Sequence, residues 1–233
     1  DRVLDRCRRG HSGADTAAAV DRLKSRGYRV GLQLMIGLPQ QDDDSAMASA
    51  ARAAALRPDF VRIYPALGIA GSPLAQWYRR GQYHPLSLDS AVSLTAEMLR
   101  LFSRHRIPVV RMGLQDTEDL RPGNQVLEGP CHPAFGELVR AAIWRQQLEQ
   151  ALCPGTGKDT LQIWVHPTTE SQVRGQKNRN LARLKTRFAL RSVSVLKDDG
   201  LDPETIRIEA DGKIQRVSFT SPGKNSGRFT VWP

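Results

Sequence analysis

The spacing of apolar residues near the start of the chain predicts a helix followed by a buried strand. Over residues 14–26 apolar side chains recur at helical intervals, and Gly27 stands where such a helix would end. Residues 28–36 are then almost continuously apolar. This pattern is typical of a parallel strand that is covered on both faces.

The same succession of helix and strand continues to about residue 112. After Gly37-Leu38-Pro39, the acidic residues at 42–44 predict the capped start of a helix that runs to Leu56. Two further strands and one helix are predicted beyond it, the strands over 59–64 and 107–112 and the helix over 91–104. Strands separated by helices of this length favour βα units around a parallel sheet, which is either open or closed into a barrel.

Glycine and proline then mark a change of organisation. A loop is predicted at 121–124 and a linker at 153–158, and we place the domain boundary at the linker, between domains over 1–152 and 159–233. The second domain opens with a strand over 160–166 and a basic helix over 178–188. Its further strand candidates lie at 191–196, 205–210 and 214–219. The predicted fold class is therefore α/β, with a small α+β module at the C-terminal end.

Charge changes this picture, because the excess of basic residues is concentrated in the second domain. The formal net charge of the 233 residues is +10. Residues 1–150 hold 20 basic and 16 acidic side chains, whereas 151–233 hold 14 and 8. This favours a polyanionic partner for the tail. A basic protein whose excess charge has no partner is the alternative that composition leaves open.

Neither a membrane span nor a cysteine framework is predicted. No run of about 18 apolar residues exists, and residues 1–10 are dense in charge instead of carrying an apolar export signal. Cys7, Cys131 and Cys153 are far apart, which suggests neither a disulfide framework nor a CxxC metal site. We therefore expect a soluble protein of a reducing, cytoplasmic compartment, without a membrane partner.

An ordered series of short motifs covers most of residues 1–150. It begins with RGHS at 9–12 and LMIGLP at 34–39, and continues with RPDFVRIYP at 57–65, GSPL at 71–74, YRRGQYHPL at 78–86 and RMGLQ at 111–115. The segment GPCHPAF at 129–135 extends the series. A GLP turn alone is a weak signal, because many βα turns use Gly and Pro. The complete series resembles the radical S-adenosylmethionine (SAM) superfamily, and within it a bacterial branch close to the Elongator catalytic subunit.

This resemblance implies a barrel fold, of which the chain corresponds to the carboxy-terminal half. In that family an electron from a [4Fe-4S] cluster, held by cysteines of a CxxxCxxC-type loop, cleaves the sulfonium of SAM. No such loop occurs in this sequence. We expect the missing half to precede Asp1, with the cluster bound only by the full-length protein, so that the chain as given is inactive.

The resemblance also implies residues that form part of a SAM pocket. Ligands of parallel α/β folds bind at the carboxyl ends of the strands, where Met35, Gly37, Leu38 and Pro39 would border the adenine. Arg9 and His11 match the family's RGH element. Gln33 lies within a predicted buried strand, where its amide needs a backbone or ligand partner, and the Tyr64 hydroxyl could serve a ligand in the same way. The ordinary alternatives are core packing for Met35 and Leu38 and a loop hydrogen bond for His11.

A basic segment in the second domain is the candidate nucleic-acid site. Leu181, Leu184 and Phe188 can bury one helix face, and this leaves basic residues stacked on another face, where like charges repel. Phosphates would neutralise them, and Gly175 before the helix could allow a phosphate to approach the backbone closely. The candidates are Arg174, Lys177, Arg179, Arg183 and Arg187. The alternative is a solvated helix face.

The leading hypothesis is a fragment of a radical SAM enzyme that supplies part of the SAM pocket, with RNA as the expected partner of the basic module and tRNA modification as the implied process. A nucleic-acid-binding α/β protein without catalysis is the second reading. A coproporphyrinogen-dehydrogenase-like radical SAM enzyme is the third. The RIYP, GSPL and YRRGQYHPL elements favour the Elongator side over the third reading.

Overall fold

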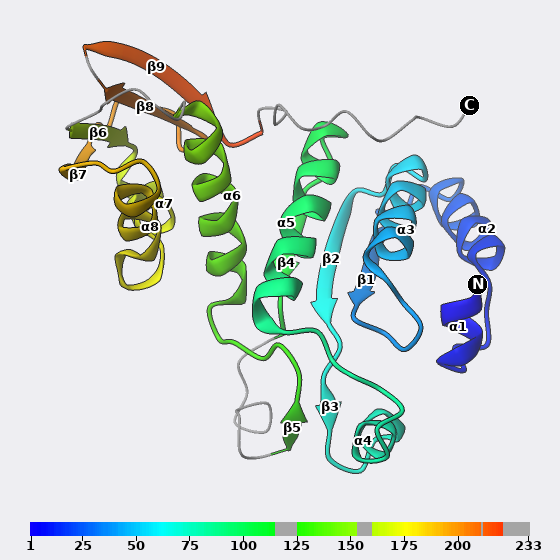
Figure 1. Ribbon diagram of the computed structural model, residues 1–233. Coiled ribbons are helices and arrows are strands. Elements are labelled where there is room, and N and C mark those ends of the chain that lie inside the picture. The colour runs from blue at the N-terminus through cyan, green and yellow to red at the C-terminus, as the bar shows by residue number, and fades with distance from the viewer. Residues whose placement is uncertain (115–124, 153–159, 211, 221–233) are drawn as a thin grey trace. The chain divides into compact units, whose positions relative to one another are not determined.

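The chain forms two compact units in a computed structural model that describes residues 1–114, 125–152, 160–210 and 212–220 (Figure 1). The units are Asp1–Gly136 and Glu137–Pro233. Helix α6 (Phe135–Ala151), which the sequence did not predict, thus belongs to the second unit from Glu137 onward, whereas the boundary predicted at the linker assigns these residues to the first domain. The predicted linker at 153–158 lies outside the described residues. No helix in the described ranges is long and apolar enough to cross a membrane.

A three-stranded parallel sheet forms the centre of the first unit. Strands β1 (Gly31–Ile36), β2 (Phe60–Pro65) and β4 (Val109–Met112) lie in the order β1-β2-β4, and both pairings are parallel. Helix α3 (Asp43–Ala55) connects the first two strands, and α5 (Leu88–Arg104) precedes the third (Figure 1). The predicted α/β class and its three strands are confirmed.

Only one face of this sheet is covered by the described residues. Leu34 and Ile36 of β1 and Val61 and Ile63 of β2 are buried, and α3 and α5 pack against the strands and against each other. Between these residues, side chains of the opposite face are exposed, among them that of Gln33. The prediction that residues 28–36 are covered on both faces is therefore wrong for the described chain, because apolar character alone did not reveal the alternation along β1.

Smaller elements complete the first unit. Helices α1 (Arg2–Arg6) and α2 (Gly13–Lys24) precede the sheet, and the side chains of Ser12 and Asp15 form a capping box at the start of α2. Strands β3 (Gly68–Ile69) and β5 (Val126–Glu128) pair antiparallel, and α4 (Pro73–Arg79) follows β3. The sequence predicted α2 but none of the other four, each of which is too short to establish a clear period.

The second unit is an α+β module, as predicted. Its four-stranded sheet has the order β7-β6-β8-β9, in which β6 and β7 are parallel and the other two pairings are antiparallel. Helices α7 and α8 and two 3-10 turns connect β6 to β7. Leu161, Ile163 and Leu184 are fully buried, and the rings of Trp144 and Phe219 meet edge to face at 5.3 Å. The bounds are β6 (Thr160–Val165), α7 (Glu170–Arg174), α8 (Arg179–Arg187), β7 (Ser192–Lys197), β8 (Thr205–Ala210) and β9 (Lys213–Ser218), with 3-10 turns at Pro167–Thr169 and Gln176–Asn178.

Candidate functional site

The turn after β1 is held by a buried tyrosine from a distant segment. Gly37 has a φ of +75°, a backbone conformation that side chains with a Cβ rarely adopt. The hydroxyl of Tyr83 donates a hydrogen bond of 2.7 Å to the carbonyl oxygen of Gly37. Tyr83 is only 5% exposed, and this burial raises its pKa to about 12. The hydroxyl therefore remains protonated and able to donate throughout the physiological pH range.

Gln41 holds the same turn through its side-chain amide. Its Nε2 donates to the carbonyl oxygen of Met35 at 3.2 Å, and its Oε1 accepts from the backbone N–H of Leu38, also at 3.2 Å. Asp42 follows as the N-cap of α3 and accepts a hydrogen bond from the N–H of Ser45. Several polar backbone groups of the turn, among them the carbonyl oxygens of Met35 and Gly37 and the N–H of Leu38, are thus bonded within the protein, which fixes the shape of its surface.

The RGH element is brought to this turn from the start of the chain. An Nη of Arg9 donates to the sulfur of Met35 at 3.0 Å, and an Nη of Arg2 donates to the carbonyl oxygen of Gln40 at 3.0 Å. His11 is exposed, and its Nδ1 lies 3.0 Å from the carbonyl oxygen of Arg9. Arg9 and Met35 therefore are in contact. His11 instead makes a hydrogen bond within its own loop, which was the alternative to a role in the SAM pocket.

Tyr64 lies beside Met35 at the carboxyl ends of two neighbouring strands. The register of β1 and β2 pairs Met35 with Tyr64 and Ile36 with Pro65. Met35, Leu38 and Tyr64 are half-buried, whereas Pro39 is buried. Five of the predicted pocket residues, Met35, Gly37, Leu38, Pro39 and Tyr64, thus lie at one edge of the parallel sheet, with Arg9 at its rim.

Gln33 differs from its prediction. Its side chain is exposed on the uncovered face of the sheet instead of buried within it. The strand register places Gln33 beside Arg62, and Arg62 beside Arg111. The argument that burial forces the Gln33 amide to find a partner therefore fails. These three residues form a row of polar side chains across this face, two residues before Met35 in β1 and two residues before Tyr64 in β2.

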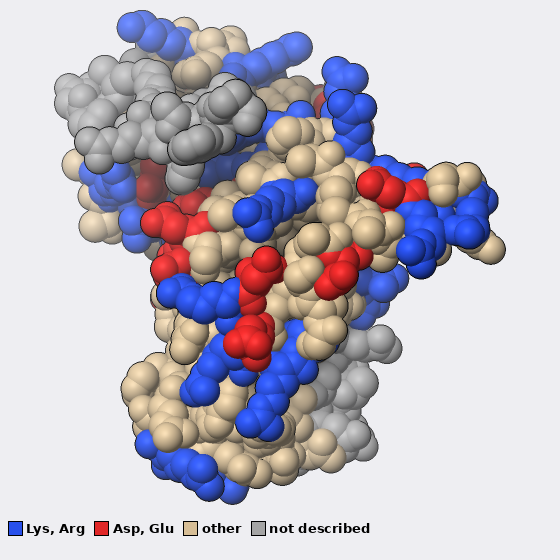
Figure 2. Space-filling view, turned by 90° about the vertical axis from the view of Figure 1, so that its right-hand side faces the viewer, with Lys and Arg blue, Asp and Glu red and all other residues tan. Residues whose placement is uncertain are grey.

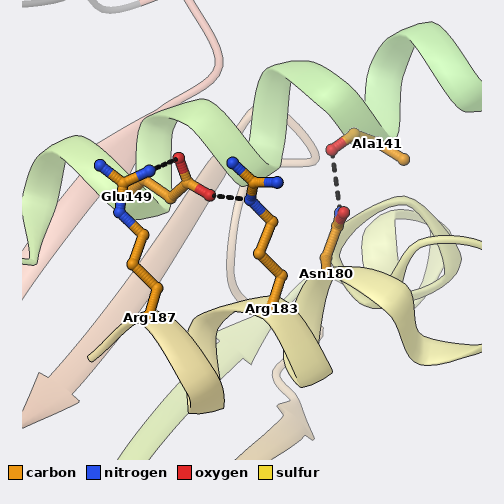
Figure 3. Close-up of polar contacts among 5 residues, drawn as sticks. All are labelled: Ala141, Glu149, Asn180, Arg183 and Arg187. Atoms are coloured by element: carbon orange, nitrogen blue, oxygen red, sulfur yellow. Dashed lines mark hydrogen bonds and ion pairs between the residues drawn. The ribbon is translucent and has the colours of Figure 1, made fainter. Parts of the chain in front are cut away.

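In the second unit, an acidic residue that the sequence analysis missed neutralises part of the basic segment. Glu149 of α6 accepts a bond of 2.7 Å from Nε of Arg183 and one of 2.8 Å from an Nη of Arg187 (Figure 3). Arg174 is paired with Glu170 at 2.8 Å. Phosphates are therefore not required to relieve the repulsion between Arg183 and Arg187, because a carboxylate far away in sequence supplies that charge. Binding of this segment to nucleic acid stays a prediction. Lys177 and Arg179 are exposed.

Gly175 is engaged inside the protein instead of being open to a phosphate. Its N–H donates to the carbonyl oxygen of Ser171 at 2.9 Å. A Cβ placed on Gly175 would lie 2.9 Å from Cγ of Asn180, so this glycine makes room for that buried side chain. Close backbone approach here serves packing of the module.

Asn180 and Gln41 are supporting residues that sequence reasoning did not single out. Asn180 is 5% exposed, and its Nδ2 donates to the carbonyl oxygens of Ala141, Val173 and Gln172 at 2.9, 3.2 and 3.3 Å (Figure 3 shows the first of these). Its place beside Leu181 on a basic helix gave no signal of burial. Tyr83 stood within the quoted YRRGQYHPL element, yet nothing in that element indicated its contact with Gly37.

Surface charge on the side of the molecule that bears α1 and α2 does not single out a site. Figure 2 shows acidic and basic side chains interspersed over this face. Mixed signs of this kind are the usual arrangement on a soluble surface. We therefore base no nucleic-acid surface on the helices of this side.

Comparison with known proteins supports the sequence resemblance. Residues 58–145 match the family model described as the Radical_SAM C-terminal domain. These residues, which run from β2 through α5 and β4 to the first part of α6, are therefore similar to a radical SAM C-terminal domain.

Within that class, the relatives are Elongator-like. The chain is 29% identical over 140 residues to the tRNA uridine(34) acetyltransferase of Methanocaldococcus jannaschii, a match that covers 59% of this chain and 25% of the relative. The enzyme of the same name from Dehalococcoides mccartyi is 28% identical over 132 residues, which cover 52% of this chain and 29% of the relative. The predicted resemblance to the Elongator branch is confirmed, over about a quarter of the length of these curated relatives.

A solved structure agrees with this assignment. The archaeal Methanocaldococcus infernus Elp3 with an N-terminal deletion superposes with a TM-score of 0.52 at 27% sequence identity. The superposition covers 61% of this chain and 33% of that chain. The parallel βα units of the first unit are therefore those of a radical SAM fold.

Proposed function

We propose that the first unit forms part of the SAM-binding wall of an Elongator-like radical SAM protein that acts on transfer RNA. The observation that carries this proposal is the edge formed by Met35, the turn at Gly37 and Tyr64. Tyr83 and Gln41 hold it from inside, and Arg9 holds it from the rim. It lies at the carboxyl ends of parallel strands, where ligands of α/β folds bind.

The residues at this edge have the mixture of apolar, aromatic and polar groups that is typical of a pocket for a ligand such as SAM. Ligand pockets are lined mainly by apolar and aromatic side chains with a few polar groups. Met35, Leu38 and Tyr64 supply half-buried surface of this kind. The Tyr64 hydroxyl makes no hydrogen bond with any residue that the structure describes, so it can bond to a ligand. Because the backbone of the turn is already bonded within the protein, this wall is shaped before a ligand arrives.

The iron–sulfur cluster does not fit the described residues. No three His, Cys, Asp or Glu side chains group together among them in a way that could hold a metal ion. In the radical SAM family, bound SAM supplies a radical once an electron has cleaved its sulfonium. The role proposed for this chain is to orient the adenine end of SAM and to exclude water from that side of the pocket.

Transfer RNA is proposed as the substrate on the names of the relatives and on charge. Two curated relatives are tRNA uridine(34) acetyltransferases, and the net charge of +10 suits a polyanion. Acetyl transfer is not part of the proposal, because the matched region covers only a minor share of those proteins.

Methionine methyl resonances test the SAM wall directly. The chain has methionines at 35, 47, 98 and 112. In a sample labelled with 13C at the methionine methyl groups, millimolar SAM should shift the Met35 signal. The signals of Met47 on α3 and of buried Met98 serve as internal references. This readout detects weak binding and does not require a cluster.

A charged substitution at the edge provides the control. Leu38→Arg should abolish the Met35 shift, whereas Leu23→Arg, at an α2 position that is 43% exposed, should preserve it. A Met35 signal that does not move, or that moves equally in Leu38→Arg, would contradict the proposal. RNA binding without any Met35 shift would favour the second reading, a nucleic-acid-binding protein without catalysis.

A further inference from the structure

Two arginines of α8 share one carboxylate. Arg183 and Arg187 stand one helical turn apart and both extend toward Glu149 on α6, side by side (Figure 3). Glu149 is 12% exposed, whereas the two arginine side chains are 54% and 51% exposed. The acid is therefore inside and the guanidinium groups are outside.

The shared carboxylate orients both guanidinium groups without using up their donors. Each guanidinium has five N–H donors in a planar fork, and Glu149 engages Nε of Arg183 and one Nη of Arg187. A shallow surface depression is lined by Ala182, Arg183, Thr186 and Arg187. Exposed donors of two fixed guanidinium groups thus border a hollow that also has a hydroxyl at its side.

Helix α8 is also anchored to α6 at a second point, near the start of α8. Asn180, one turn before Leu184, is buried and bonds to the carbonyl oxygen of Ala141 on α6. Asn180 and Glu149 therefore join α8 to α6 at two points. This fixes where the two arginines lie with respect to the carboxylate, and preorganised donors lose less entropy when they bind a ligand.

The surrounding charge indicates the ligand. From Glu137 to the end of the chain there are sixteen Lys and Arg residues and ten Asp and Glu residues, a net charge of +6. Arg179 lies one turn before Arg183, about 6 Å along the helix axis. Lys177 and Lys185 are exposed nearby in sequence. A row of cations one helical turn apart suits a chain of regularly spaced single negative charges, and the Arg fork matches phosphate oxygens in particular.

We propose that Glu149 positions Arg183 and Arg187 as a phosphate-binding pair, and that this depression on α8 binds the phosphate backbone of RNA. The choice of RNA rests on the proposed function. Glu149 is a positioning residue in this site, because it contacts the arginines and not the phosphate. Thr186, at the side of the depression, lies where a phosphate would be held.

For the substitution Glu149→Gln, this proposal predicts a change in RNA affinity opposite to the one that net charge alone predicts. Glu149→Gln raises the net charge of the unit by one, so a purely electrostatic surface would bind RNA more tightly. If the carboxylate positions the pair, the same change weakens binding, because both guanidinium groups lose their orientation. Glu170→Gln is the matched control. Glu170 also pairs with two basic residues, Arg174 and Lys197, and its loss changes the charge equally.

The measurement is filter binding of the full 233-residue chain to unfractionated tRNA at several salt concentrations. Glu149→Gln should weaken binding roughly fivefold or more, as expected for the loss of oriented charge-assisted bonds. Glu170→Gln should bind as tightly as the parent chain or more tightly. Equal or tighter binding by Glu149→Gln would overturn the proposal.

A second pair of variants tests the depression itself, without touching Glu149. Thr186→Glu places an acid between the two arginines at an exposed position, and glutamate is a good helix former, so the fold should survive. Gln215→Glu, exposed on β9, changes the charge equally at another place. Thr186→Glu should weaken tRNA binding several times more than Gln215→Glu does, and equal effects would overturn the site.

Two further outcomes separate this proposal from the proposed function. If the parent chain does not bind tRNA at low salt, the RNA partner and this site both fail, while the Met35 test of the SAM wall still stands. If tRNA binds but neither Glu149→Gln nor Thr186→Glu differs from its control, only this site fails. Competition by polyglutamate as effective as that by tRNA would overturn the assignment to a nucleic-acid backbone.

Discussion

Tyr83 and Gly37 are joined by a hydrogen bond of 2.7 Å that spans 46 positions of the chain. It connects the segment after α4 to the turn at the end of β1, and it lies inside the protein. The residue that fixes the proposed SAM wall is therefore one that does not line it. The stability of this bond can be measured independently of any ligand.

Removing the hydroxyl should lower the stability of the first unit. Tyr83→Phe leaves the carbonyl oxygen of Gly37 without this partner, and we expect a loss of about 1–2 kcal/mol in the free energy of unfolding. Urea denaturation measures this loss. Tyr28→Phe, at a position that is 62% exposed, should change it little. Equal effects at the two positions would show that the buried bond contributes nothing.

The same tyrosine should make stability depend on alkaline pH. Burial raises the pKa of Tyr83 from 10 to about 12. Its folded pKa lies above the unfolded value, so its contribution is complete below pH 10 and is lost as the pH rises from 10 toward 12. The difference in unfolding free energy between the parent chain and Tyr83→Phe should therefore shrink from pH 9 to pH 11. A constant difference would contradict the raised pKa.

Alanine at Gly37 should be more costly than backbone strain alone explains. An added Cβ would meet Cγ of Leu86 at 3.1 Å, at a φ of +75°. Gly27 has a similar φ of +79° with no atom within 4 Å of such a Cβ. Gly27→Ala should cost about 1 kcal/mol, and Gly37→Ala should cost more. Thermal unfolding of both variants measures the difference, and an equal cost would mean that Leu86 moves aside freely.

A carboxylate at position 180 should destabilise the second unit strongly. The amide nitrogen of Asn180 faces three carbonyl oxygens, and Asn180→Asp would replace it with an unpaired buried acceptor. We expect a loss of about 3 kcal/mol or more. Asn178→Asp, at an exposed position two residues earlier, makes the same chemical change and should stay within about 0.5 kcal/mol. Circular dichroism during urea unfolding compares the two.

Acid should weaken the start of α3 in the parent chain. The backbone N–H of Ser45, and then its side chain, lower the pKa of Asp42 below its usual value. The contribution of a group with a lowered pKa is present above its unfolded pKa and lost as the pH falls through its folded pKa. Asp42→Asn keeps a good N-cap, so it should match the parent near neutrality and lose less stability below about pH 4. Parallel acid dependence in both chains would contradict this assignment.

Repeating patterns in the sequence were sufficient for most of the longer elements, but not for the 17-residue helix α6, which was not predicted. The strands over β1, β2 and β4 and the α+β succession from β6 to β9 were predicted because each strand or helix is long enough to show its period. Elements such as β3, β5 and α4 contain only a turn or a few residues. Their existence depends on tertiary contacts, which local sequence does not encode.

In the candidate sites, too, the sequence predicted positions within an element but not contacts between distant segments. The position of Met35, Gly37 and Tyr64 at the ends of strands follows from their place in the sequence. Gln33 was expected to be buried because the apolar run hid which face it occupies. The contacts of Tyr83 with Gly37 and of Glu149 with Arg183 connect residues 46 and 34 positions apart, and a single sequence carries no signal that aligns them.

The anchoring of α8 by Asn180 has a consequence for how variants of this protein should be interpreted. A neutral amide that never meets a ligand sets the alignment of α8 on α6, and Arg183 and Arg187 take their positions from that alignment. A conservative substitution at Asn180 would therefore shift α8 along α6 and move both guanidinium groups away from Glu149 together. Such a variant would remain folded and keep all of its positive charges, and yet bind a polyanion with lower affinity.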